Sequence, residues 1–180
     1  MYEISDTGLV VTGGPRTDLF VDPAGAGPVP DAGRLVGLPP AGDFRLSARV
    51  TVGFTDTYDA GCLLLYADET HFAKLCFEYS PQHRPTAVTV VTRGTSDDCN
   101  SFEVEGDTLW LRVLRTGSVW AFHASTDGEW WRLLRYFALD APVPVKVGFL
   151  AQSPTGAGCT ATFAEIAYRP EAVEDLRDGS

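Results

Sequence analysis

The chain has 180 residues, of which 44% are hydrophobic and 21% are charged, and its formal net charge at pH 7 is −10. This composition is typical of one globular domain with its own core and excludes a disordered chain. The negative charge excludes nucleic acid and anionic membrane as expected partners, because both would repel it, and no apolar run is long enough for a transmembrane helix.

Residues 1–43 are rich in glycine and proline, which favours loops and short strands. Strands are predicted there at Leu9–Thr12 and Leu19–Val21. From Phe44 to Val52 apolar and polar residues alternate with a period of two, which is typical of a strand with one buried face. Cys62–Tyr66 is apolar throughout, so we expect a strand that is covered on both faces.

Two segments fit a helix or a strand. Residues 72–79 are short, aromatic and followed by Pro81, which favours a strand. Residues 130–139 follow Asp127-Gly128, a hairpin signal, which again favours a strand. Further strands are predicted at Val88–Thr92, Phe102–Val104, Leu109–Leu114, Val119–Ser125, Val145–Gln152 and Ala161–Tyr168.

This series of short strands with no predicted helix indicates an all-β sandwich or a barrel. Because several strands are apolar on both faces, we favour a jelly-roll β-sandwich of two antiparallel sheets. One domain is predicted over residues 1–170, followed by a polar acidic tail over residues 171–180.

The four cysteines have no Cys-x-x-Cys spacing, so no zinc site is predicted. The N-terminus has no signal-peptide pattern, which predicts a cytoplasmic protein with reduced thiols. No cofactor and no metal are predicted, and the pattern leaves the oligomeric state open.

Seven short motifs, in their order and spacing, resemble a family of unknown function related to the yeast regulation-of-enolase-1 protein. The motifs are Thr17–Pro23, Tyr58–Gly61, Ala73–Tyr79, Val91–Asp97, Trp110–Val113, His123–Gly128 and Gly148–Pro154. The resemblance implies a concanavalin A-like jelly roll, the fold of many lectins and glucanases. It implies no established activity.

Polar residues stand in the middle of several apolar strands, where they need a partner or a ligand. In jelly rolls of the kind that the chain resembles, one sheet is concave and its central side chains form a ligand groove. The alternatives are an internal network of ion pairs and a sheet face that is open to water. The strand residues in question are Lys74, Glu78, Arg93, Arg112, His123, Ser125 and Gln152.

A second set lies in a predicted polar loop, residues 93–98, which contains Ser96, Asp97 and Asp98, and includes Asp59. Carboxylates and hydroxyls in loops suit a calcium ion. The spacing matches no known calcium loop, and the favoured interpretation is a turn in which Asp97 or Ser96 bonds its own backbone.

Catalysis is the third candidate. Glycoside hydrolysis requires two carboxylates on either side of the scissile bond. Glucanases of this fold carry Glu-x-Asp-x-x-Glu on one strand, whereas Ser80 and Gln82 follow Glu78 here. A pair across strands, Glu78 with Asp97 or Asp59, stays possible.

The sequence therefore predicts a soluble domain that binds a carbohydrate or another polar ligand on its concave face. Arg93, Arg112, Lys74 and His123 would supply donors, and Glu78 and Asp97 acceptors. One alternative is a glycoside-active enzyme that uses Glu78 as its general acid. The other is a protein-interaction module that regulates a metabolic enzyme.

Overall fold

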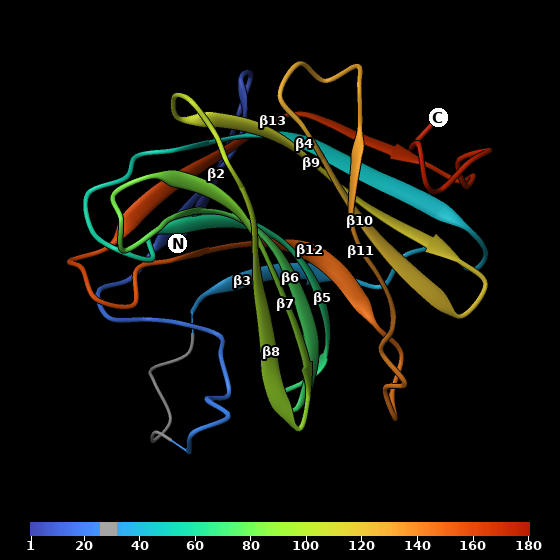
Figure 1. Ribbon diagram of the computed structural model, residues 1–180, viewed down its shortest axis with the longest axis horizontal. Coiled ribbons are helices and arrows are strands. Elements are labelled where there is room, and N and C mark those ends of the chain that lie inside the picture. The colour runs from blue at the N-terminus through green and yellow to red at the C-terminus, as the bar shows by residue number, and fades with distance from the viewer. Residues whose placement is uncertain (26–31) are drawn as a thin grey trace.

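The computed structural model describes residues 1–25 and 32–180, which form two antiparallel sheets stacked face to face (Figure 1). The first is a seven-stranded sheet, in spatial order β1 (Tyr2–Ser5), β2 (Gly8–Gly13), β13 (Cys159–Arg169), β4 (Phe44–Val52), β9 (Thr108–Thr116), β10 (Val119–Ser125) and β11 (Arg132–Ala138). The second is a six-stranded sheet, in order β3 (Arg34–Gly37), β12 (Lys146–Gln152), β5 (Ala60–Asp68), β6 (His71–Tyr79), β7 (Pro85–Arg93) and β8 (Thr95–Glu103).

The predicted sandwich of two antiparallel sheets is confirmed. The residues described form strands and loops, and none of them lies in a helix. Both ambiguous segments are strands, β6 and β11. The glycines and prolines between residues 26 and 31 lie outside the described part of the chain.

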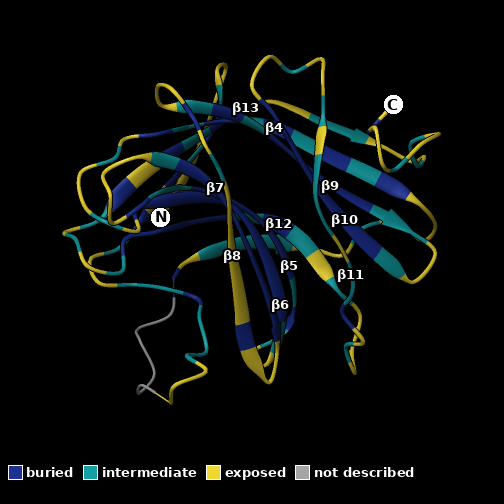
Figure 2. Cartoon of the chain, in the orientation of Figure 1, coloured by how far each residue is buried: buried dark blue, intermediate teal, exposed yellow. Residues whose placement is uncertain are grey.

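The main core lies between the two sheets (Figure 2). The period of two in β4 turns Phe44, Val50 and their alternate neighbours inward, as the sequence predicts. Leu63 and Phe77 face them from the six-stranded sheet. Each large apolar side chain buried in this way stabilises the fold by roughly 1.5–3 kcal/mol.

A smaller apolar cluster lies on the outer face of the six-stranded sheet. It exists because the N-terminal segment around Leu19 packs on that face. Cys62 of β5 and Cys76 of β6 lie opposite each other there, both reduced, with their Sγ atoms 3.1 Å apart. The prediction that Cys62–Tyr66 is covered on both faces is confirmed, since β5 is buried from Ala60 to Leu65.

Two local predictions were wrong. Residues 19–21 form no strand, although Val21 donates its N–H to the Ser96 hydroxyl at 2.9 Å and accepts a bond from the Ser96 N–H. Residues 95–98 form no loop and instead begin the edge strand β8. Most residues of β8 are polar and face water, so the strand lacks the alternation of apolar and polar residues by which a strand is predicted.

Residues 171–180 form turns on the side of the seven-stranded sheet, coloured red in Figure 1. Arg45 of β4 forms an ion pair with Glu171 at 2.8 Å. The division of the chain into a domain over 1–170 and a tail over 171–180 stays a prediction.

Among the described residues there is no helix long and apolar enough to cross a membrane.

Candidate functional site

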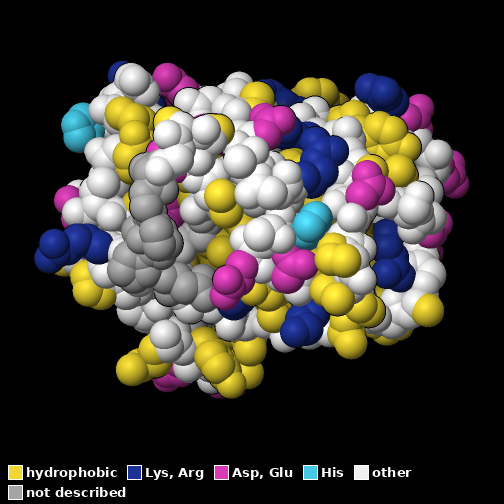
Figure 3. All heavy atoms as spheres, turned by 90° about the horizontal axis from the view of Figure 1, so that it is seen from below, with side chains coloured by type: hydrophobic (Ala, Val, Ile, Leu, Met, Phe, Trp, Pro, Cys, Tyr) yellow, Lys and Arg dark blue, Asp and Glu magenta, His cyan; other side chains and the backbone are white. Residues whose placement is uncertain are grey.

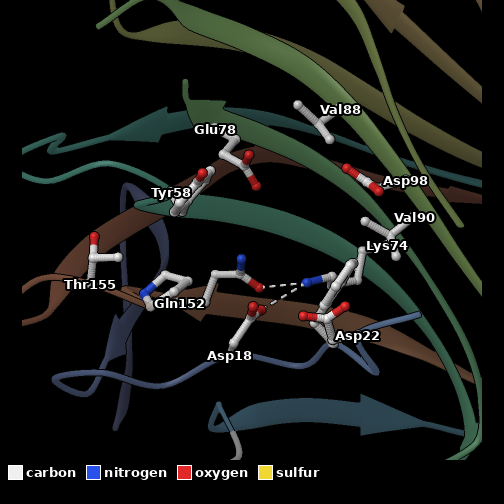
Figure 4. A pocket seen from close by; sticks show the side chains of 12 residues that line it. Asp18, Asp22, Tyr58, Lys74, Glu78, Val88, Val90, Asp98, Gln152 and Thr155 are labelled. Atoms are coloured by element: carbon white, nitrogen blue, oxygen red, sulfur yellow. Dashed lines mark hydrogen bonds and ion pairs between the residues drawn. The ribbon is translucent and has the colours of Figure 1, made fainter. Parts of the chain in front are cut away.

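A pocket of about 370 Å³ opens on the outer face of the six-stranded sheet, within the usual range for small-molecule sites. The sheet supplies its floor, and the N-terminal segment and two loops supply its walls. Its lining residues are Asp18, Phe20, Asp22, Tyr58, Lys74, Glu78, Val88, Val90, Asp98, Gln152, Pro154 and Thr155 (Figure 4). In the view from below, acidic, basic and hydrophobic side chains are mixed over the surface (Figure 3).

Strand register brings the polar side chains together. Lys74 and Glu78 are four residues apart on β6, so they share a face. Ala60 of β5 lies between Glu78 and Gln152, paired with the first on one side and the second on the other. Because Ala60 is small, the two longer side chains extend above it. Asp98 joins the same face from β8, opposite Val90.

Lys74 is the central residue of the pocket. Its side chain is 2% exposed, and its Nζ donates to Asp18 Oδ1 at 3.0 Å and to Gln152 Oε1 at 2.8 Å (Figure 4). Burial by itself disfavours the ammonium, but the negative charge of Asp18, with smaller contributions from groups around Lys74 that include Glu78, outweighs burial and keeps the pKa of Lys74 above its ordinary value. Lys74 is therefore charged at any physiological pH.

The ion pair also fastens the N-terminal segment to the sheet. Asp18 comes from that segment, and its neighbour Thr17 exchanges backbone hydrogen bonds with Ser153 at 3.2 Å. A buried ammonium is stable only with a well-placed partner. The pair therefore fixes where the segment lies over the sheet.

Glu78 is half-buried, and burial raises its pKa to about 7, an effect that Lys74 opposes and that Asp18 and Asp98 reinforce. Within the part of the chain that the structure describes, no hydrogen bond to its carboxyl group is found. Near neutral pH Glu78 can therefore donate a proton to a ligand or accept a hydrogen bond from one.

Tyr58 stands at the rim of the pocket and is 39% exposed. Its φ is +69°, a left-handed conformation that costs a non-glycine residue roughly 1–2 kcal/mol. The cost is offset by the loop, where Tyr58 N–H donates to the Tyr79 carbonyl at 2.7 Å and Tyr79 N–H donates to the Asp59 carbonyl at 3.0 Å. The fold thus holds a strained aromatic residue beside the pocket.

Asp59 holds this loop and does not face the pocket. Its Oδ2 accepts the N–H groups of Thr55 and Asp56, both at 2.9 Å, and its Oδ1 accepts the Ser153 hydroxyl at 2.6 Å. The turn that the sequence favoured at Ser96 or Asp97 is not formed, because both residues lie in the strand β8. No group of three or more potential metal ligands is found among the residues described.

Three other predicted residues do not line the pocket. Ser96 is bonded to Thr92 Oγ1 at 2.8 Å and to Val21, so it anchors the N-terminal segment. Asp97 points to the opposite face of β8 and forms an ion pair with Arg135 at 2.8 Å. Arg93 donates to the Ala138 carbonyl at 3.4 Å.

The expectation of one groove containing Arg112, His123 and Ser125 needs correction. These residues belong to β9 and β10, and they face outward from the seven-stranded sheet, whereas the pocket lies on the outer face of the other sheet. Ser125 caps the hairpin, with its hydroxyl donating to Asp127 Oδ1 at 2.8 Å. The alternation of apolar and polar residues predicts which face of its own sheet a side chain lies on. It does not predict which of the two sheets the strand belongs to.

Sequence reasoning missed several lining residues. Asp18, Phe20 and Asp22 lie within the motif Thr17–Pro23, so a signal for them was present in the resemblance. The sequence placed Asp98 in the same loop as Asp97 but predicted Asp97 as the acceptor, because the polar sequence of β8 does not show which of the two faces the pocket.

The chain belongs to the family described as protein of unknown function (DUF1349), whose model matches residues 1–171. None of the curated protein sequences matches it.

Several solved structures have a similar fold. A functionally unknown protein from Saccharomyces cerevisiae is 21% identical, with a TM-score of 0.81 over 96% of this chain and 93% of that one. Xylan beta-1,4-xylosidase from Bacillus halodurans is 12% identical, with a TM-score of 0.70 over 90% of this chain and 32% of the enzyme. The alginate lyase from Klebsiella pneumoniae is 13% identical, with a TM-score of 0.59 over 94% of this chain and 84% of the lyase. These likenesses show a shared β-sandwich fold.

The raised pKa of Glu78 predicts a specific dependence of stability on pH. Between its ordinary value of 4.5 and its folded value of about 7, the folded state binds the proton more tightly than the unfolded state. The free energy of unfolding should therefore fall as pH rises through this window, by at most about 3 kcal/mol from this group.

Urea unfolding of the wild type and of Glu78→Gln at several pH values from 4 to 8 measures the effect. The difference between the two curves should grow across the window, with the variant becoming relatively more stable at higher pH. Parallel curves would contradict the burial of Glu78.

The ion pair of Lys74 with Asp18 gives a second prediction. Asp18→Asn should lower the free energy of unfolding by about 3 kcal/mol, because it leaves a buried ammonium without its counter-charge. Adding Lys74→Met should recover much of that loss, since both charges are then gone.

The exposed pair of Arg135 with Asp97, whose carboxylate side chain is 63% exposed, is the matched control. Asp97→Asn should cost less than about 1 kcal/mol. Equal costs at the two pairs would show that Lys74 is not shielded from water as described.

Proposed function

We propose that this member of the DUF1349 family binds a neutral carbohydrate or another polyol in the pocket around Lys74. The observation that carries the proposal is the half-buried Glu78 beside a fixed Lys74. A carboxyl group with no hydrogen-bond donor among the described residues faces a cavity of about 370 Å³. An ionisable group with a raised pKa that lines a pocket favours a binding or catalytic role.

The remaining lining suits the surface of a sugar. Carboxylates such as Asp22 and Asp98 accept hydrogen bonds from hydroxyl groups, and the amide of Gln152 can donate one. Val88 and Val90 provide an apolar floor, and Tyr58 an exposed ring at the rim. A concave, partly apolar site with a few converging polar groups is the usual form of a small-molecule site.

The charges in the pocket limit the ligand class. Lys74 is the one basic residue among the described residues of the pocket's lining, and it is already paired with Asp18. The acidic residues of the lining are Asp18, Asp22, Glu78 and Asp98. An anionic ligand such as a uronate or a phosphate would meet an excess of negative charge at short range. A neutral or cationic polyol is therefore favoured.

The names of the solved structures support the same class. A xylosidase and an alginate lyase both act on polysaccharides, and both contain this β-sandwich. Likeness of fold is an analogy, and the residues of the pocket carry the argument.

Asp98 and Asp97 are adjacent in sequence and face opposite sides of β8, which allows a matched test. A panel of neutral sugars, amino sugars and uronates is screened by isothermal titration calorimetry. For the neutral or amino sugar that binds most tightly, Asp98→Asn should raise the dissociation constant by about 10-fold or more. The reason is that hydrogen bonds to charged groups contribute roughly 1.5–3 kcal/mol. Asp97→Asn should leave the dissociation constant unchanged.

Preferential binding of uronates, or equal effects of the two substitutions, would contradict the proposed site. The absence of any sugar binding by a correctly folded protein would contradict the proposed function.

One observation favours a second candidate, an enzyme that acts on glycosides with Glu78 as its general acid. A general acid must hold its proton near the working pH, and burial raises the pKa of Glu78 to about 7. Asp98 lines the same pocket and replaces Asp97 and Asp59 as the possible second carboxylate.

In this case the chain would release a chromophore from aryl glycosides of neutral sugars, and Glu78→Gln would lower the rate by at least about 100-fold. Asp97→Asn is the control and should retain the wild-type rate. Turnover that survives Glu78→Gln would exclude this mechanism. The third function predicted from the resemblance, a protein-interaction module, would require a different surface.

A further inference from the structure

A second polar patch lies on the outer face of the seven-stranded sheet. Ser47 of β4, Arg112 of β9 and His123 of β10 lie side by side in register. Trp131 borders the row, with the centre of its ring 4.3 Å from the guanidinium carbon of Arg112. We call these residues and their arginine neighbours, Arg45 and Arg169, the arginine patch.

The tail, residues 171–180, covers this patch through its main chain. Arg112 Nη2 donates to the Gly179 carbonyl at 2.7 Å, and His123 Nε2 donates to the Leu176 carbonyl at 2.9 Å. A carbonyl can only accept, so the proton of His123 lies on Nε2. Burial lowers the pKa of His123 to about 4, so its ring is neutral at pH 7. Both bonds recognise peptide carbonyls, which every protein segment carries.

The approach of the tail is close enough to require glycine. A Cβ atom at Gly179 would lie 2.8 Å from Trp131 Cβ and 2.8 Å from Arg112 Nη2. The φ of this residue is +82°, which glycine adopts without strain. The patch therefore holds the main chain of the tail in a defined position beside the tryptophan.

The tail leaves part of the patch unsatisfied. Arg112 is 5% exposed and His123 is fully buried, yet Arg112 Nε and His123 Nδ1 have no hydrogen-bond partner among the residues described. Each unpaired buried polar atom costs roughly 1–3 kcal/mol. A longer or differently placed peptide could satisfy these atoms, so the tail is an incomplete occupant.

Charge indicates which peptide would fit. Arg45, Arg112 and Arg169 line the patch and Glu129 is its one acidic residue in the described part of the chain, although the whole protein carries a net charge of −10. The tail that covers the patch is acidic overall, with Glu171, Glu174, Asp175 and Asp178 against Arg177, and Glu171 pairs with Arg45. Complementary charge of this kind favours acidic segments over basic ones.

The family model includes the arginine patch but excludes most of the tail that covers it. It matches residues 1–171, and every residue of the arginine patch lies within them. The tail is held by two side-chain bonds to its carbonyls and by the ion pair of Arg45 with Glu171, whose side chain is 61% exposed. The exposed ion pair is weak, whereas the buried bond of Arg112 involves a charged donor and contributes roughly 1.5–3 kcal/mol, so a partner must replace that bond.

From these observations we propose that the arginine patch binds an extended acidic peptide segment of a partner protein, and that residues 172–180 occupy it in cis until the partner displaces them. A tethered tail acts at an effective concentration in the millimolar range, so a partner must exceed that competition. The proposal is independent of the pocket around Lys74.

The test uses the full chain with its tail released by Gly179→Val. The probe is a fluorescent peptide with the sequence of residues 172–180, and binding is measured by fluorescence anisotropy. The peptide should bind Gly179→Val at least about 10-fold more tightly than the wild type, because the competing tail is gone. The side-chain nuclear magnetic resonance signals of Arg112 and His123, whose N–H groups donate to tail carbonyls, should shift when the tail is released.

Gly106→Val is the matched control. Gly106 also has a positive φ, of +88°, but no atom lies within 4 Å of the position that a Cβ would take there, so the substitution adds similar strain far from the tail. It should leave peptide binding at the wild-type level. In the Gly179→Val background, Arg169→Gln should weaken binding several-fold, because Arg169 lines the patch and Arg45 is already paired with Glu171 outside the peptide. A peptide with its acids replaced by amides should bind more weakly in low salt.

Three results would overturn the proposal. The first is that the released variant, with native circular dichroism, binds the acidic peptide no better than the wild type does. The second is that the amidated peptide binds equally well. The third is that the side-chain signals of Arg112 and His123 stay as in the wild type in Gly179→Val, which would show that the close contact of Gly179 with the patch does not hold the tail.

Discussion

The buried ion pair of Lys74 with Asp18 is the interaction on which the six-stranded sheet and its pocket depend. A lysine in the middle of an apolar strand is stable only if an anion reaches it, and the anion comes from a segment more than 50 residues earlier in the chain. Its arrival covers the small apolar cluster around Cys62 and Leu64. The same N-terminal segment forms one wall of the cavity. Glu78 and Asp98 line this cavity too, and their carboxyl groups can bind a ligand.

The two outer faces of the sandwich follow the same physical rule. In each, a strand places a buried cation on an outward face, Lys74 on one sheet and Arg112 on the other, and a segment without regular structure supplies the acceptor. The N-terminal segment offers a carboxylate, and the tail offers a main-chain carbonyl. The first arrangement leaves a pocket for a small molecule, and the second leaves a surface suited to a peptide.

The sequence predicted the fold and the strand residues of the pocket because both depend on a period of two. Phe44 to Val52 showed its buried face directly, and the spacing of Lys74 and Glu78 placed both on one side of β6. The separation of Arg112 from Lys74 could not be predicted, since it depends on the order of strands in space. Which of Asp97 and Asp98 faces the pocket depends on the register of the edge strand β8. The polar sequence of β8 has no alternation of apolar residues from which this could be predicted. Tyr58 and Asp18 come from loops, whose positions follow from long-range contacts.

Mapping a bound sugar by nuclear magnetic resonance tests the central claim most directly. A neutral sugar is titrated into the isotopically labelled protein, and shifts of the amide and side-chain signals are followed. The account predicts that the largest shifts occur at Lys74, Glu78 and Asp98, with Arg112 and His123 unaffected. Shifts concentrated on the seven-stranded sheet, or spread over the surface without a centre, would contradict it.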